Sequence, residues 1–249
     1  MRRLAIAFLT IASVLIFQSR AMALVSVEAR YWLSELDAEV KVTENGLTGT
    51  EIDLERDLGV DTEENFLEGR ITFEFGKHRV RYAFVPLSWD GSKTITKSIN
   101  FAGKGYSVST DVTTSLDVDY HRLGYEYDFV KVAGNRFGII AELKVFDIDA
   151  SLESIVVSES ESILVGLPTL GVAFQMGLPS VFNVSGEITG ITYGGDAYFV
   201  DGEVGLNITP LPLVSISGGY RYMKLYAEVE DDKVDLQLDG PFIMVRVGF

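Results

Sequence analysis

The sequence of 249 residues contains no cysteine, two histidines and few basic residues. Without cysteine there is no disulfide framework, no cysteine-ligated zinc and no thiol nucleophile. His78 and His121 leave little material for histidine-based metal sites or catalytic triads. Acidic residues outnumber basic ones by 36 to 21, whereas a nucleic-acid-binding protein needs a basic face. We therefore expect no nucleic-acid partner, no cofactor and no metal site, and most enzyme classes are disfavoured.

The N-terminus has the organisation of a signal peptide. The basic residues Arg2 and Arg3 precede an apolar run over 4–17, and Ala21-Met22-Ala23 supplies the small residues of a cleavage site. The run is short for a membrane-spanning helix, which needs about 20 apolar residues. We expect residues 1–23 to be a signal peptide cleaved near Ala23, with an uncleaved N-terminal anchor as the alternative, and residues 24–249 to form one exported domain.

After residue 23 the sequence lacks sustained helical periodicity and instead alternates with a period of two, which is typical of β-strands. In the segment 71–75, Ile-Thr-Phe-Glu-Phe, apolar and polar residues alternate, and the segments 123–129 and 243–249 do the same. Each such segment has one apolar stripe and one stripe of charged or small residues. The fold class is therefore all-β.

Short and long connections alternate strictly along the chain. Short turns are expected near 76–78, 133–136, 177–180 and 209–212, and longer polar connections near 43–65, 91–104, 149–162, 190–196 and 230–234. These nine connections join ten predicted strands, at 24–42, 66–75, 79–90, 105–131, 137–148, 163–176, 182–190, 197–208, 213–229 and 235–249. An even number of strands with short turns at one end and long loops at the other predicts a single closed antiparallel transmembrane β-barrel of about ten strands. Eight strands with extended hairpins is the nearest alternative, and a soluble β-sandwich or barrel is the other.

Aromatic residues near the strand ends favour a membrane barrel over a soluble one, because aromatic girdles lie at bilayer interfaces. The predicted membrane-interface aromatics are Tyr31, Trp32, Trp89, Tyr125, Tyr127, Phe129, Tyr220 and Tyr222. The last strand ends with Val245, Val247 and Phe249 on one face. In this ending the chain resembles bacterial outer-membrane β-barrel proteins, of the small OmpA-, OmpX- and OmpW-like class, whose final strand ends in Phe. The resemblance implies a signal read by the outer-membrane assembly machinery, a place in the outer membrane of a Gram-negative bacterium, and contact with its lipid and lipopolysaccharide.

The polar stripes of the predicted strands would line the lumen of this barrel. The expected lumen charge network comprises Glu68, Arg70, Glu74, Arg79, Arg81, Glu126, Asp128, Glu142, Lys144, Glu187, Glu203, Arg221 and Arg246. Because both signs are present and a buried unpaired charge is costly, we favour salt bridges that plug the lumen. A polar, ion-conducting lumen is the alternative.

Two segments depart from this pattern. Residues 162–186 carry no charge, and their Pro and Gly residues argue against a helix. We interpret this hairpin as a lumen wall packed by small residues, with an interface to another protomer or a greasy lumen as alternatives. Residues 52–59 have the potential to add a helical turn or a short strand to the first long loop.

Little in the sequence indicates chemistry. Asp119 and His121 share a strand face, so a barrel hydrolase acting on lipid or peptide is a conceivable function, but no signature sequence accompanies them. Acidic clusters in the long loops suggest solvated surfaces, or oxygen ligands for divalent cations that would bridge to lipopolysaccharide phosphates. We expect no catalytic site, and predict a small outer-membrane barrel with a structural or surface-interaction role and a largely plugged lumen. A narrow porin for ions or small solutes is the main alternative.

Overall fold

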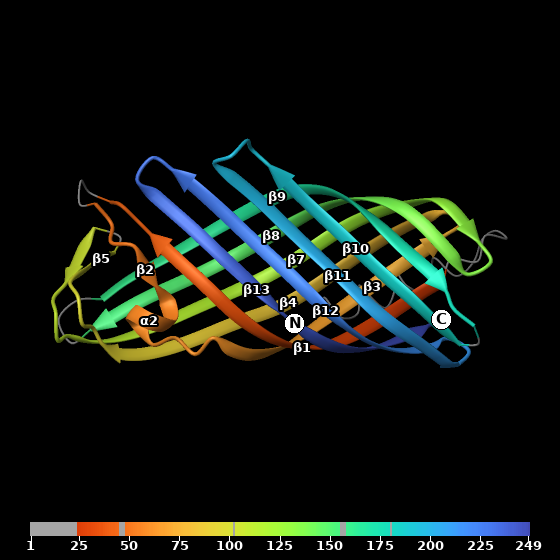
Figure 1. Ribbon diagram of the computed structural model, residues 1–249, viewed down its shortest axis with the longest axis horizontal. Helices are drawn as coiled ribbons and strands as arrows, with labels where there is room; N and C mark the ends of the chain where they lie inside the picture. The colour runs from red at the N-terminus through yellow and green to blue at the C-terminus, as the bar shows by residue number, and fades with distance from the viewer. Residues whose placement is uncertain (1–23, 45–47, 102, 155–157, 180) are drawn as a thin grey trace, which may run out of the picture.

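The computed structural model describes residues 24–44, 48–101, 103–154, 158–179 and 181–249. Over these residues the chain forms an elongated barrel of long, strongly tilted antiparallel strands (Figure 1). The predicted signal peptide, residues 1–23, lies outside the described residues and stays a prediction.

Ten strands form the wall of the barrel. They are β1 (Leu24–Lys41), β3 (Glu63–Phe75), β4 (His78–Thr94), β7 (Asp111–Val132), β8 (Asn135–Ser154), β9 (Ser158–Gly177), β10 (Phe182–Thr192), β11 (Ala197–Leu211), β12 (Val214–Val229) and β13 (Asp232–Gly248). Each pairs with its neighbours along the chain, and β13 pairs with β1 to close the barrel. The ten-strand prediction is confirmed and the eight-strand alternative is wrong.

The wall strands are longer than a bilayer requires. Membrane-spanning barrel strands need about 9–11 residues, whereas β7 has 22 and β8 has 20. The prediction of a long polar loop over 149–162 was therefore mostly wrong, because β8 continues to Ser154 and β9 begins at Ser158. Asp149, Ser151, Ser160 and Ser162 in this region lie on the outer face of extended strands.

The polarity of both faces of the wall inverts partway along the barrel. On β8 the outward residues are apolar from Phe137 to Val145 and then acidic at Asp147 and Asp149. Its inward residues change the other way, from Glu142 and Lys144 to apolar residues beyond them. The end nearer the short turns is therefore apolar outside and charged inside, as expected within a bilayer, and the long-loop end is charged outside and apolar inside, as expected in water.

The long-loop end is filled by an apolar layer. Its wall residues are Trp32, Leu36, Phe66, Val85, Leu87, Trp89, Val118, Tyr120, Phe146, Phe199, Met223 and Leu238. Residues from the long connections pack against these side chains and also become buried, namely Ile52, Leu54, Leu58, Val60, Ile95, Ile99 and Tyr106. We call residues 52–60 the inserted segment.

The inserted segment contains β2 (Ile52–Asp53) and the short helix α2 (Leu54–Leu58). The carboxylate of Asp53 caps the helix by accepting a hydrogen bond from the backbone N–H of Arg56 at 2.7 Å. Gly59 ends it in the left-handed conformation, with φ of 68°. The prediction of a helical turn or short strand here is confirmed. Within the described part of the chain, no helix has the length and apolar character needed to cross a membrane.

Candidate functional site: the barrel lumen

The membrane-level half of the lumen is filled by side chains of both charges, which we call the charge layer. Among the described residues, ion pairs connect nine acidic and nine basic side chains of this lumen into one network. These are Glu28, Glu68, Glu74, Glu126, Asp128, Glu142, Glu187, Asp201 and Glu203 with Arg30, Arg70, Arg79, Arg81, Arg122, Arg136, Lys144, Arg221 and Arg246. These nine carboxylates and nine cations balance when all are ionised, and Lys131 at the short-turn end adds a tenth cation by pairing with Glu74.

Asp201 of β11 is the hub on the side facing the apolar layer. Arg221 of β12 donates to both of its oxygens, at 3.1 and 3.0 Å. Lys144 of β8 lies 2.6 Å from Oδ2, and the hydroxyl of Tyr120 donates to the same oxygen at 3.0 Å. All four side chains are buried, so this carboxylate forms ion pairs with two buried cations.

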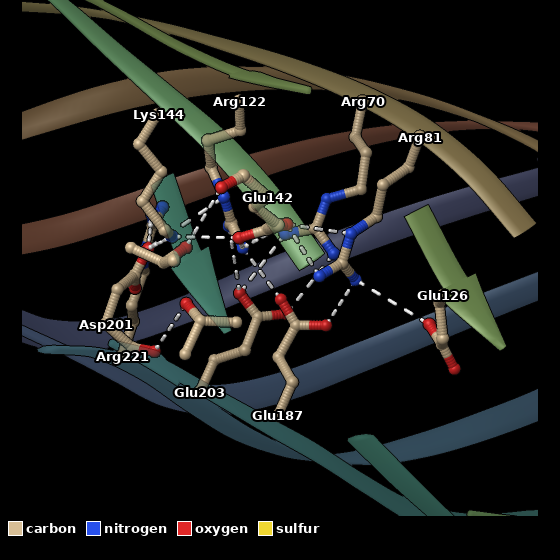
Figure 2. Close-up of polar contacts among 12 residues, drawn as sticks. Arg70, Arg81, Arg122, Glu126, Glu142, Lys144, Glu187, Asp201, Glu203 and Arg221 are labelled. Carbon is tan, nitrogen blue, oxygen red and sulfur yellow. Dashed lines mark hydrogen bonds and ion pairs between the residues drawn. The ribbon is translucent and has the colours of Figure 1, made fainter. Parts of the chain in front are cut away.

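A second cluster crosses the lumen between β4, β7, β8 and β10 (Figure 2). Arg81 donates to Glu142 at 2.7 Å and to Glu187 at 2.5 Å. Arg122 contacts the same two carboxylates, at 3.2 and 2.8 Å. These bonds join β4 and β7 to β10 across the lumen, so paired charged side chains lie within the lumen at this level.

All thirteen residues expected in the lumen lie there, but the sequence reading missed five members of the network: Glu28, Arg30, Arg122, Arg136 and Asp201. The alternation of side chains along a strand could have identified two of them, because Arg122 lies on the same face as Glu126 and Asp201 on the same face as Glu203. Arg30 was missed because the adjacent Tyr31 and Trp32 were both assigned to the membrane interface, which adjacent strand residues cannot share.

The predicted interface aromatics divide into two groups. Tyr31, Tyr125, Tyr127, Phe129, Tyr220 and Tyr222 lie on the outward face of the wall. Trp32 and Trp89 do not, and their assignment was wrong: both are buried inside, where Trp32 donates to the carbonyl of Gly240 at 3.3 Å and Trp89 packs edge-on against Phe66. They lie at the level where the interior is apolar, so an apolar side chain there points inward.

Asp119 and His121 lie on the outer face of β7, not in the lumen. The only bulge of β7 against β8 lies at 128–130, so nothing turns His121 inward. Its Nδ1 is 2.8 Å from the hydroxyl of Tyr82, and its ring stacks on Phe84. Asp119 faces Asp147 across the strand pair, and no hydrogen bond joins it to His121 in the described contacts. The arrangement needed for a hydrolytic dyad is not formed.

The outward acidic residues include two cross-strand pairs of like charge, Asp117 with Asp149 and Asp119 with Asp147. Such pairs destabilise a sheet, which is tolerated where water screens them. Among the residues that the structure describes, no group of three or more His, Asp or Glu side chains is arranged to hold a metal ion.

A polar cavity of about 180 Å³ separates the charge layer from the short-turn end. Charged residues of the network line its inner side, and Asn183, Asn207 and Ser217 line the rest. The amide of Asn207 donates to Asn183 at 2.8 Å, and Ser217 donates to Asn207. The lumen thus has a small polar cavity toward its short-turn end.

The inserted segment is tied to the second long connection by Asp57. The ammonium of Lys97 lies 2.6 Å from its Oδ2, and the backbone N–H of Asp53 donates to the same oxygen at 3.0 Å. Burial by itself raises the pKa of Asp57, but the hydrogen bonds from Lys97 and Asp53 outweigh it, so the pKa lies below its usual value. The ionised carboxylate therefore contributes to docking of the segment.

Docking of the inserted segment is expected to weaken in acid. Because the pKa of Asp57 is lower when the segment is docked, its contribution is complete above the usual carboxyl pKa of about 4 and is lost as the pH falls through the docked value. The effect is about 1 kcal/mol or less for a partly exposed pair. An environment-sensitive fluorophore on an introduced Glu55→Cys would report undocking during an acid titration. Asp57→Asn should remove this component, and an unchanged titration curve in that variant would contradict the assignment.

The C-terminal residues lie beside the N-terminal strand. Val245 and Val247 point outward from β13, and Phe249 exchanges two backbone hydrogen bonds with Val25 of β1, at 3.3 and 2.7 Å. The residues proposed as an assembly signal therefore lie at the seam that closes the barrel.

No protein-family model matches the sequence, and no curated protein sequence matches it either. Solved structures do match. The outer membrane protease OmpT from Escherichia coli aligns with a TM-score of 0.61 and 9% identity, covering 94% of this chain and 99% of OmpT. The transport unit of the autotransporter AIDA-I from Escherichia coli gives a TM-score of 0.44 and 7% identity, over 97% of this chain and 95% of that one. Ail of Yersinia pestis, in complex with the heparin analogue sucrose octasulfate, gives 0.38 and 15%, over 89% and 98%.

The likeness to OmpT establishes the fold, which is that of a bacterial outer-membrane β-barrel. At 9% identity it carries nothing further about activity. The function has to be argued from the lumen and the surfaces of this chain.

Proposed function

We propose that this protein is a non-conducting β-barrel of the bacterial outer membrane, with a structural or surface-interaction role. The apolar outer belt and the fold support the location, because an unpaired backbone group in hydrocarbon costs several kcal/mol and a closed barrel has no edge. In this orientation the short turns face the periplasm, and the long connections with the acidic outer face project outside the cell.

The observation that supports the proposal is that two layers of side chains occupy the lumen. The charge layer joins opposite walls by ion pairs between buried side chains such as Arg81, Glu142 and Asp201. Above it, the apolar layer and the inserted segment fill the projecting half of the barrel. An ion crossing this lumen would have to displace a paired network and then pass through a packed apolar core, which is costly in both steps.

Conductance in a planar bilayer tests the closure directly. Residues 24–249, refolded and verified as folded by protease resistance in vesicles, should produce no steady single-channel openings at moderate salt. The reason is that neither layer leaves a continuous aqueous path. Reproducible openings from the folded chain would contradict the proposal and favour the narrow porin, with Arg79, Arg81, Glu126 and Arg221 as its selectivity residues.

OmpT is named as a protease, but proteolysis is not the function we propose for this chain. The only candidate pair from the sequence, Asp119 and His121, lies on the outer face without the hydrogen bond that would orient the imidazole. A barrel hydrolase would therefore need residues other than these two.

The outer surface suggests the partners. Acidic residues above the apolar belt, with Lys93 and Lys97 in the second long connection, lie at the height where lipopolysaccharide headgroups would contact the barrel. We propose that outer-membrane lipid and lipopolysaccharide surround this region, and that the strand ending in Phe249 is read by the assembly machinery. The projecting long-loop end is then the working surface.

A further inference from the structure

The ladder between β9 and β10 stops partway along the wall. β9 pairs with β8 as far as Ser158, but its pairing with β10 runs only from Gly177 to Leu170, opposite Gly190. β10 ends at Thr192, and the β10–β11 hairpin turns back well before the far end of β9 (Figure 1). In the part of the chain described, residues 158–169 of β9 therefore have no strand on their β10 side.

A crevice of about 520 Å³ lies where this ladder ends. Its lining includes Leu170, Ile188 and Val200, which point outward, and Ile191 and Phe199, which belong to the inward face. Because successive residues of a strand point to opposite faces, a lining drawn from both faces shows that the crevice enters the thickness of the wall. Phe199 is itself buried in the apolar layer, so the crevice ends against a residue of the barrel core.

The chemistry of the crevice is apolar. It borders the uncharged stretch 162–186, and its two threonine hydroxyls already donate to backbone carbonyls, Thr189 to Asp201 at 3.4 Å and Thr192 to Gly194 at 2.8 Å. Neither glycine in the lining has room for a side chain that would fill the crevice. A Cβ at Gly171 would lie 1.9 Å from the carbonyl oxygen of Ile188, and one at Gly190 would lie 2.7 Å from that of Phe199.

The height of the crevice matches the outer part of the apolar belt. Gly166 pairs with Val145, the last apolar outward residue of β8, and Leu164 pairs with Asp147. Beyond Gly166 the unpaired edge of β9 is therefore at the level of charged residues, where water satisfies its backbone. Within the belt only residues 166–169 are unpaired on that side, and Pro168 among them has no N–H to satisfy.

We propose that this crevice binds one acyl chain of a lipid from the surrounding outer leaflet; the inference rests on the proposed membrane location. An acyl chain needs no hydrogen-bonding partner and fits a predominantly apolar lining without charges. A strand from a second copy fits less well, because it would have to pair with an edge that Pro168 interrupts. The barrel would thus hold a specific lipid between β9 and β10, distinct from the lipids that only contact its outer face.

Photolabelling with a lipid tests this. The chain is reconstituted in vesicles of phosphatidylethanolamine and phosphatidylglycerol, with a trace of phosphatidylethanolamine carrying a diazirine at the end of one acyl chain. After irradiation, peptide mass spectrometry should find adducts on the inward Phe199 as well as on outward residues such as Leu143. Adducts on outward residues alone would overturn the crevice. Absence of adducts at Leu143 as well would instead overturn the membrane location.

Closing the crevice supplies the control. The chain has no cysteine, and extending the β9–β10 register by one step places Thr169 opposite Ile191, so Thr169→Cys with Ile191→Cys creates a single disulfide across the gap. Oxidation should lower labelling of Phe199 at least fivefold, and reduction should restore it, while labelling of Leu143 stays constant. Ile191→Trp fills the crevice without any disulfide and should also lower the labelling of Phe199. Ile139→Trp, on the outer face of β8, should leave that labelling unchanged. If Phe199 is still labelled in the oxidised double-cysteine variant and in Ile191→Trp, the proposal is overturned. Disulfide-linked dimers would instead assign the crevice to a second copy of the chain.

Discussion

Replacing Asp201 by alanine is expected to destabilise the barrel by about 3–5 kcal/mol, because removal of one partner leaves buried charges uncompensated. Arg221 would keep Glu68 at 2.7 Å, but Lys144 would keep only Glu142, at 2.9 Å, and the hydroxyl of Tyr120 would lose its acceptor. The measurement is urea unfolding in phospholipid vesicles, followed by the fluorescence of the two tryptophans, both of which are buried in the interior.

Two further variants separate charge compensation from loss of packing. Asp149→Ala removes an aspartate on the outer face, opposite Asp117, and should change the unfolding free energy by about 0.5 kcal/mol at most. Asp201→Leu combined with Lys144→Met removes one charge of each sign and should cost clearly less than the sum of the single variants, because neither charge is left alone. Equal losses for Asp201→Ala and Asp149→Ala would show that the network contributes nothing specific.

The number of strands and their order could be predicted because alternation and turn composition are local properties of the sequence. The thirteen expected lumen residues lie in the lumen for the same reason, since each follows from the parity of its own strand. Parity alone, however, does not say which face is inside. Which face points inward depends on whether water or bilayer surrounds that part of the strand. If bilayer is assumed along the whole strand, Trp32 and Trp89 are placed on the wrong side.

The inversion of polarity explains the mixed character of the outward residues around His121. His121 follows the outward Asp117 and Asp119 and precedes the outward Leu123 and Tyr125. In the sequence this resembles a change of phase that would require a bulge, but all five residues lie on one face of an unbroken strand. What changes at His121 is the environment of that face, from water to hydrocarbon.

The burial of the inserted segment and the crevice beside β10 were beyond prediction for a different reason. Burial of the inserted segment depends on the space left between distant wall residues, and the crevice depends on β10 being shorter than β9. Both are properties of the assembled barrel. The sequence carried only indirect signs of them: apolar residues within a polar loop at Ile52, Leu54 and Leu58, and the uncharged stretch over 162–186.

A series of arginine substitutions along the outer face of β8 should map the boundary between the two environments. Ala141 lies midway between Phe137 and Val145 in the apolar belt, and Ala141→Arg is expected to cost about 2–4 kcal/mol, as for a charge on the lipid face near the bilayer midplane. Asp147 lies six residues further along the same face, opposite Asp119. Asp147→Arg should stabilise the barrel by about 0.2–1 kcal/mol, because it replaces a cross-strand pair of like charge by one of opposite charge.

The opposite signs of these two effects make the series decisive. They share one strand, one face and one introduced side chain, so the size of the new side chain cannot by itself produce a change of sign. Unfolding free energies in vesicles would measure both. A similar cost at positions 141 and 147 would mean that the bilayer covers the acidic part of the wall as well, whereas a negligible cost at both would mean that the apolar belt does not face lipid. A cost at Ala141 with a gain at Asp147 places the membrane boundary between them, at the height where the interior changes from the charge layer to the apolar layer.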